Sequence, residues 1–401
     1  MQPRNRRSLF SVSRLWHFIC ISGIAAAALV LGGCAEQPIE ERSLNEIGMV
    51  FSAADVMEED ALRDRVDNAL AITEARTMRS TTNAAWQIMH GVLGYGTKLR
   101  IHNDNEELVP AVDWILSGGN LRGWTMRQGR KFPDGRYGLR AVIESGTKAG
   151  QGHKDQWLAV LSQCDLEADQ EIKVGKRTYT MMDMVRQAQW ECYDGMEASW
   201  TVIGLNYYLS LDAEWTARDG NKWNFEKLIA LEARQELGAS ACGGTHRLIG
   251  MTMLLNRYVN EHPHKKLTGG WLAADKKIEG AVRRAKDFQQ ADGAFSTSYF
   301  GRAGSSPDAH LIIGTTGHTL EFLAFALDDE EIKKPWMTKA AEKLCEVFED
   351  TKDRDVECGA LYHAAHGLQL YRFRRFGAPD PRDVAQADAP DSPQIAESRE
   401  D

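Results

Sequence analysis

The stretch Thr315-Thr316-Gly317-His318 begins a segment that turns apolar on nearly every side, a pattern typical of a helix buried all round. Five other segments begin in the same way, in small or polar residues. Their openings are Asn83-Ala84-Ala85-Trp86, Gly150-Gln151-Gly152-His153, Glu197-Ala198-Ser199-Trp200, Gly243-Gly244-Thr245-His246 and Gly359-Ala360-Leu361-Tyr362-His363. The large aromatic or histidine of each opening recurs after 67, 47, 46, 72 and 45 residues. A base period near 46 with two insertions indicates a repeated helical unit.

Amphipathic segments alternate with these apolar ones. The clearest apolar stripes are Ile278, Ala281, Val282, Ala285 and Phe288, and Met337, Ala340, Leu344, Val347 and Phe348. An outer helix needs one apolar face and an inner helix needs two covered flanks, so six such pairs can close into a ring. We therefore expect an all-α fold, an (α/α)6 toroid of six outer and six inner helices, over residues 54–377. The two insertions, 97–150 and 295–314, are expected to form long loops at its rim.

One turn carries a resemblance to a known superfamily. The turn Gln290-Ala291-Asp292-Gly293-Ala294-Phe295 resembles the QW-type repeat of the terpenoid cyclase and protein prenyltransferase toroids. Asp219-Gly220-Asn221-Lys222-Trp223 and Thr268-Gly269-Gly270-Trp271 are weaker matches. The resemblance implies the architecture and no reaction, because one scaffold hosts many activities. Asp353-Arg354-Asp355-Val356-Glu357 lacks the adjoining aspartates of a squalene-type cyclase motif, so terpene cyclisation is not expected. Glu357-Cys358 followed by His363 departs from the spacing of the prenyltransferase zinc ligands, so prenyl transfer is not expected either.

The two ends of the chain differ in composition from the body. Residues 1–33 have an arginine-rich start and an apolar stretch from Leu15 to Leu31, which together predict a signal peptide. Gly32-Gly33-Cys34 resembles a bacterial lipoprotein box, which implies lipidation of Cys34, although a membrane-spanning anchor is an alternative. Residues 34–53 would be a tether. Residues 378–401 are acidic and proline-rich and predict a disordered tail.

This N-terminus predicts a membrane partner and a location in the bacterial cell envelope. Ala35 follows the lipidation site where an inner-membrane retention signal would place Asp, so we expect the outer membrane, facing the periplasm. The chain has 57 acidic and 48 basic residues and a formal net charge of −9, so a nucleic-acid partner is not expected. The sequence contains no Gly-x-Ser-x-Gly, Gly-Lys-Ser or His-Glu-x-x-His motif.

Four histidines stand at equivalent positions of the repeat. If the ring closes, the inner-helix openings bring His153, His246, His318 and His363 to one mouth. Glu197 and Tyr362 open two inner helices beside them and complete the candidate catalytic set of His153, His246, His318, His363, Glu197 and Tyr362. A histidine can act there as a base or as a ligand. A purely structural role at solvated helix starts is the alternative interpretation.

A metal site is the most specific hypothesis for the role of these histidines. Cys242 and His246 are four residues apart, which would put them on one helical face, and His318 could complete a Cys/His set for zinc. The site is loosely similar to that of LanC-type cyclases, which implies zinc binding in a toroid, but their adjacent Cys-His-Gly run is absent. A disulfide between Cys242 and Cys358 is the competing interpretation, because both cysteines open inner helices in an oxidising compartment.

These observations predict a lipid-anchored envelope protein with a histidine-lined pocket. We expect the pocket to bind or act on an envelope or extracellular polymer such as a polysaccharide, since similar toroids host polysaccharide lyases and glycoside hydrolases. In that case a carboxylate pair or a histidine would supply the acid and the base. The alternatives are a non-catalytic module that binds a peptide or another ligand, or serves as a scaffold, and a zinc-dependent toroid enzyme.

Overall fold

The computed structural model describes residues 53–123, 126–142 and 151–378. The predicted signal peptide, Cys34, all but the last residue of the predicted tether, and the acidic tail from residue 379 lie outside the described residues. Among the helices in the described part of the chain, none is both long enough and apolar enough to cross a bilayer.

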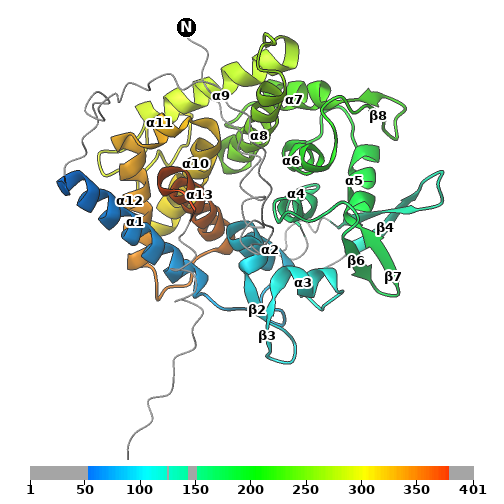
Figure 1. Cartoon of the computed structure of the whole chain (residues 1–401), viewed down its shortest axis with the longest axis horizontal. Coiled ribbons are helices and arrows are strands. Elements are labelled where there is room, and N and C mark those ends of the chain that lie inside the picture. Colours follow the sequence, from blue (N-terminus) through cyan, green and yellow to red (C-terminus); the bar gives the residue numbers. More distant parts are fainter. Residues whose placement is uncertain (1–52, 124–125, 143–150, 379–401) are drawn as a thin grey trace, which may run out of the picture.

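Six helices form a closed ring (Figure 1). They are α2 (Ala85–Tyr95), α4 (Gln156–Ser162), α6 (Ser199–Tyr208), α8 (Thr245–Glu261), α10 (Ala309–Ala326) and α13 (Cys358–Phe376). Each packs against the next, and α13 returns to α2. These are the apolar segments of the repeat, and nearly every residue of α4, α6 and α10 after its start is buried. The ring helices are therefore buried both on the side that faces the centre of the ring and on the side that faces the outer helices.

Shorter and longer helices cover the outside of the ring. They are α1 (Ala53–Glu74), α3 (Ala111–Leu116), α5 (Met181–Trp190), α7 (Phe225–Arg234), α9 (Gly269–Asp287), α11 (Asp329–Ile332) and α12 (Pro335–Asp350), with the 3₁₀ turns η4 (Gly96–Lys98) and η5 (Ala241–Gly244). Helix α12 is typical: Pro335 occupies its first turn, and its stripe of Met337, Leu344 and Phe348 is fully buried. Burial of one face against the ring stabilises each of these amphipathic helices.

The expectation of an all-α toroid is wrong, because four small β-sheets interrupt the outer layer. β1 (Met78–Arg79) pairs parallel with β2 (Arg100–His102), which pairs antiparallel with β3 (Leu108–Pro110). Three antiparallel hairpins follow: β4 (Met126–Lys131) with β5 (Tyr137–Ala141), β6 (Glu171–Val174) with β7 (Arg177–Thr180), and β8 (Trp215–Thr216) with β9 (Lys222–Trp223). The fold is mixed. Most of these strands are shorter than the four to eight residues over which an alternation of apolar and polar residues can be recognised in a sequence.

Helices α10 and α13 make the closest contact in the ring, and two glycines allow it. A Cβ atom on Gly317 would lie 2.3 Å from the Cβ of Ala364. A Cβ atom on Gly367 would lie 2.7 Å from the backbone nitrogen of Glu321. The two backbones therefore touch at points where any larger side chain would force the helices apart.

Arginines from neighbouring helices cap the C-terminal ends of two ring helices. Arg257 of α8 donates to two carbonyls at the end of α6, at 2.5 and 2.7 Å. Arg374 of α13 donates in the same way to two carbonyls at the end of α10, both at 2.7 Å. These bonds satisfy carbonyl groups that have no partner within their own helix.

The contact between α10 and α13 generates a stability prediction. Gly317→Ala should lower the free energy of unfolding by about 1–3 kcal/mol, because the added methyl overpacks the helix contact. Gly314→Ala on the same helix is the matched control, since its Cβ would meet only Ala360 at an ordinary 3.6 Å. The control should be neutral or gain up to about 1 kcal/mol from helix propensity. Urea denaturation of both variants measures this, and a Gly317→Ala protein as stable as the wild type would contradict the close-contact account.

Candidate functional site

The ring brings five histidines into one cluster at its centre. The ring centroid of His246 lies 5.5 Å from that of His153, 5.4 Å from that of His318 and 5.0 Å from that of His363. His318 and His363 are stacked, with their centroids 4.1 Å apart. His90 of α2 lies 5.4 Å from His363. Side chains that are far apart in the sequence therefore share one interior chamber, to which α2, α8, α10, α13 and the turn before α4 contribute.

His318 does not occupy the first helical turn that the sequence predicts for it. Helix α10 begins at Ala309, where the side chain of Asp308 accepts a hydrogen bond from the backbone N–H of His310. The predicted loop 295–314 is therefore helical in its last six residues. His318 lies in the middle of a long helix, so it is not in the first turn, where backbone N–H groups have no partner within the helix.

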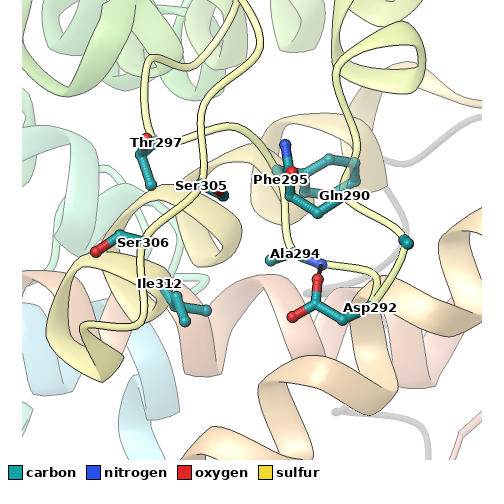
Figure 2. Close-up of a pocket in the computed structure, with 9 residues that line it drawn as sticks. Gln290, Asp292, Ala294, Phe295, Thr297, Ser305, Ser306 and Ile312 are labelled. Atoms are coloured by element: carbon teal, nitrogen blue, oxygen red, sulfur yellow. Dashed lines mark hydrogen bonds between the residues drawn. The ribbon is translucent and has the colours of Figure 1, made fainter.

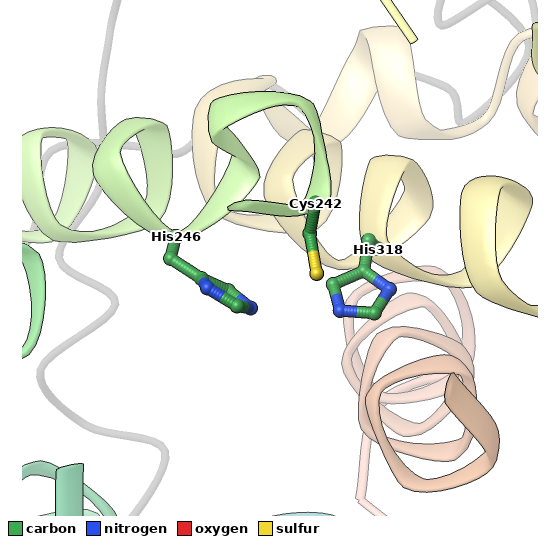
Figure 3. Close-up of side chains that lie close together, drawn as sticks. All are labelled: Cys242, His246 and His318. Carbon is green, nitrogen blue, oxygen red and sulfur yellow. The ribbon is translucent and has the colours of Figure 1, made fainter. Parts of the chain in front are cut away.

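Cys242, His246 and His318 could hold a metal ion. One ligand atom from each of the three residues lies within 4.8 Å of the others. Figure 3 shows the thiol of Cys242 between the two imidazole rings. His246 and His318 are 5% and 4% exposed, so a bound ion would be largely shielded from solvent. The disulfide between Cys242 and Cys358 is not formed; Cys358 instead accepts a hydrogen bond from the side chain of Gln87.

The backbone around Cys242 is unusual. Cys242, Gly243 and Gly244 have φ angles of 50°, 62° and 81°, so three consecutive residues are left-handed immediately before α8 begins at Thr245. A non-glycine residue in this conformation costs about 1 kcal/mol or more, and such strain is concentrated at functional sites. Cys242 therefore does not share a helical face with His246. The turn itself aims the thiol at the histidines.

Tyr299 covers this turn from outside. A Cβ atom on Gly243 would lie 2.2 Å from the ring of Tyr299, so only glycine allows the contact. The loop that carries Tyr299 also forms part of a hollow of about 270 Å³, which Figure 2 shows beside the start of α10. Asp292 and Phe295, from the turn that resembles a QW-type repeat, line the same hollow. Through Tyr299, the loop therefore covers the turn that carries Cys242.

The hydrogen bonds of His318 determine which of its nitrogens faces the thiol. Its Nδ1 lies 2.7 Å from the carbonyl oxygen of Gly314, which can only accept, so Nδ1 carries the hydrogen. The Nε2 atom is then the one available to Cys242. Burial lowers the pKa of His318, but its electrostatic interaction and hydrogen bond with Cys242 raise it to about 9.

His246 has no hydrogen-bond partner in the described part of the chain. Both of its ring nitrogens are buried without a donor or acceptor within reach. Burial, followed by the charges of the neighbouring histidines, holds its pKa well below the ordinary value, so the ring is neutral and offers a lone pair. A buried polar group without a partner costs about 1–3 kcal/mol, and its presence calls for a ligand or a function.

Glu321 orients two histidines at once. Its two carboxylate oxygens accept hydrogen bonds from Nδ1 of His363 and Nδ1 of His366, each at 2.7 Å. Burial raises the pKa of Glu321, but His363 and His366 outweigh it and hold the pKa well below the ordinary value. Because the carboxylate takes both Nδ1 hydrogens, Nε2 of His363 keeps its lone pair. That atom is buried and without a partner among the described residues.

The remaining predicted residues are divided between the chamber and the core. Glu197 accepts a hydrogen bond from Nδ1 of His153 at 2.9 Å, and both side chains are partly exposed at the edge of the cluster. Burial raises the pKa of Glu197, and the bond to His153 lowers it below its ordinary value. Tyr362 does not join the cluster: it is 2% exposed and packs edge-to-face against Tyr95 and over Gly94 of α2. Burial raises its pKa.

The predicted catalytic set does not include Glu321 or His90. Glu321 is three residues after His318, one turn along the same helix, and this spacing already indicates that the carboxylate lies near His318. His90 is four residues after Trp86 on α2, and its Nδ1 bonds the Trp86 carbonyl at 2.7 Å. His366 is likewise one turn beyond Tyr362. All three lie one helical turn beyond a position of the repeat.

The burial of His90 generates a pH prediction. Burial lowers the pKa of His90 from 6.5 to about 3, so between these values the unfolded chain binds a proton that the folded chain does not. The lowered pKa of His90 therefore does not reduce the free energy of unfolding above pH 6.5. As the pH falls from 6.5 toward 3, the free energy of unfolding decreases, because the unfolded chain is stabilised by the proton that it binds. By pH 5 the loss is about 2 kcal/mol. His90→Gln should therefore lose about 2 kcal/mol less than the wild type between pH 7 and pH 5.

Urea denaturation in the presence of a chelator measures this difference. His310→Gln, which removes an exposed histidine of α10, is the control variant. Equal losses in the wild type and in His90→Gln would exclude His90 as a source of acid sensitivity.

The chain was compared with protein families, curated proteins and solved structures. No family model, curated protein or solved structure matches it. The resemblance to the terpenoid cyclase and prenyltransferase toroids consequently stays a prediction.

Proposed function

We propose that this protein is a zinc-dependent hydrolase whose metal is bound by Cys242, His246 and His318. The observation that carries the proposal is His246, a buried imidazole with no partner at either nitrogen among the described residues and with the thiol of Cys242 close by. A metal ion at the centre of the three groups would give His246 the partner that the protein does not supply. The strained turn at Cys242 supports the same conclusion.

The chemistry of the ligands favours zinc. Thiolate and neutral imidazole together are typical zinc ligands, whereas magnesium and calcium prefer oxygen. Nδ1 of His318 is already fixed by the carbonyl of Gly314, which is the usual support for a metal-bound histidine. The pKa of His318 is raised by its pairing with Cys242. A zinc ion would replace that pairing, because it binds thiolate and neutral imidazole together.

Three protein ligands favour a catalytic site over a structural one. Structural zinc sites usually have four protein ligands, and catalytic sites have three and a water molecule. When bound in this way, zinc lowers the pKa of the water to about 7 and so supplies a nucleophile. His363, held by Glu321, presents a lone pair beside His318 and could accept a hydrogen bond from such a water. Hydrolysis is the reaction that this combination supports best.

The substrate and the location are proposed from the sequence. We propose an envelope or extracellular polymer as substrate, with the protein held at the membrane by lipidated Cys34. Glu197 and His153 at the partly exposed edge of the cluster are the groups that such a chain would meet first. A non-catalytic role would leave the same pocket as a ligand-binding module.

Metal analysis tests the proposed function. The full chain, purified without chelator and without affinity-tag histidines, should contain about one zinc ion per chain. Cys242→Ser and the His246→Ala, His318→Ala double variant should lose it, because each removes part of a three-ligand set. His153→Ala is the matched control, since it removes a histidine of the same cluster that lies outside the set, and it should keep the metal.

Cobalt substitution checks the ligands directly. The cobalt-loaded wild type should show a thiolate-to-metal charge-transfer band that Cys242→Ser lacks. Zinc or cobalt bound equally well by the double variant would refute the site. Stoichiometric zinc without zinc-dependent release of fragments from a panel of charged and neutral polysaccharides would support the binding module and overturn the hydrolase.

The anchor has its own test. Cys34→Ser should abolish attachment of the lipid, because it removes the thiol that would carry it while the apolar segment before it is unchanged. Metabolic labelling with a radioactive fatty acid measures the modification, and Cys20→Ser is the control within the predicted signal peptide. An unlabelled wild-type chain that stays in the membrane would indicate a spanning anchor instead.

A further inference from the structure

Two hairpins give one edge of this acidic protein a positive charge. Residues 126–141 and 171–180, which contain the β4–β5 and β6–β7 hairpins, carry eight basic and two acidic side chains, whereas the whole chain has a net charge of −9. Figure 1 shows both hairpins at the same edge of the ring. Most of these basic side chains are exposed. The charge is therefore concentrated on a surface and is not spread over the molecule.

Part of this charge has no role in holding the hairpins together. Arg127 and Arg140 face each other directly across β4 and β5, an arrangement of like charges that destabilises a sheet. Arg140 is neutralised by Glu191 at 3.0 Å. Within the described residues, Arg127, Lys173 and Lys176 have no carboxylate partner. Their positive charges remain available to a ligand.

The β4–β5 hairpin packs closely against α5. Gly129 and Gly138 lie so close to the side chain of Gln187 that a Cβ atom on either would fall 2.0–2.3 Å from its oxygen. The same oxygen accepts a hydrogen bond from the backbone N–H of Arg130 at 2.9 Å. Arg136 bonds Asp183 at 3.1 Å. The basic groups of the β4–β5 hairpin therefore project from backbone that is anchored to α5, which reduces the entropy lost on binding.

An aromatic ring connects the two hairpins, and their base lies next to the chamber. The guanidinium of Arg177 in β7 lies 5.5 Å from the ring centre of Tyr137 in β5, and the ammonium of Lys131 lies 5.8 Å from it. At the other end of β5, the side chain of Gln151 donates to the carbonyl of Ala141 at 3.0 Å, two residues before His153. A ligand lying along the hairpins would be directed toward His153.

We propose that this basic face, defined by Arg127, Lys131, Lys173, Lys176 and Arg177, binds an anionic polysaccharide, one that carries carboxylate or sulfate groups. Exposed guanidinium and ammonium groups spread over two hairpins match charges repeated along a chain better than a single small anion. A membrane surface fits less well, because α1 begins on the side of the ring opposite the hairpins (Figure 1). The proposal does not require a metal ion, although it names a substrate class for the proposed hydrolase.

Charge reversal tests this surface in the full chain. The triple variant Arg127→Glu, Lys173→Glu, Lys176→Glu should bind polygalacturonate or dextran sulfate about tenfold more weakly than the wild type, or weaker still. The control triple Lys276→Glu, Arg283→Glu, Arg284→Glu changes the net charge equally at exposed positions of α9 and should bind like the wild type. Wild-type binding should weaken with added salt and be absent for neutral dextran.

Three outcomes would overturn the proposal. They are no binding by the wild type at low salt, equal losses in the two triple variants, and stronger binding to phosphatidylglycerol vesicles than to either polysaccharide, which would make the face a membrane contact. The melting temperature of each triple variant establishes that it is folded. Zinc content should be unchanged in both, so a failure here is distinguishable from a failure of the metal site.

Discussion

The close contact between α10 and α13 is the constraint on which the site depends. Gly317 and Gly367 let the two backbones touch, and this distance places Glu321 of α10 within 2.7 Å of two histidines of α13. The same contact stacks His318 on His363 at 4.1 Å. A wider separation would break the carboxylate bonds and the stacking together. The arrangement of the polar side chains in the cluster therefore depends on the small residues that let the two helices pack closely.

Without a ligand, the histidine cluster reduces the free energy of unfolding. Buried imidazoles that lack partners reduce stability, and His246 and His363 both present such nitrogens among the described residues. Natural structures rarely retain these groups unless function requires them. The Arg257 and Arg374 caps satisfy carbonyl groups at the opposite helix ends. Oγ1 of Thr252 and Oγ1 of Thr319 are other buried polar atoms of the ring helices without a partner among the described residues, but only His246 has two such atoms on one side chain.

The repeat predicted much of the ring, and its failures have physical reasons. The spacing of His153, His246 and His363 indicated residues that the structure brings together, because a period of apolar helices constrains which positions face inward. Tyr362 turned away because adjacent residues on a helix point about 100° apart, and His363 takes the inward direction. The left-handed turn at Cys242 depends on its fit against Tyr299, which no local pattern reveals. The strands could not be predicted, because most are too short to show an alternation of apolar and polar residues.

The closure of the ring by α13 also determines when the site can exist. His363 and Glu321 meet only after the last described helix has packed between α2 and α10, so contacts between the two ends of the fold complete it. Such long-range closure is slow compared with helix formation, and a chain that stops before α13 would expose the apolar flanks of two ring helices. An incomplete chain would thus lack the contact between His363 and Glu321 and would be recognisable to proteases.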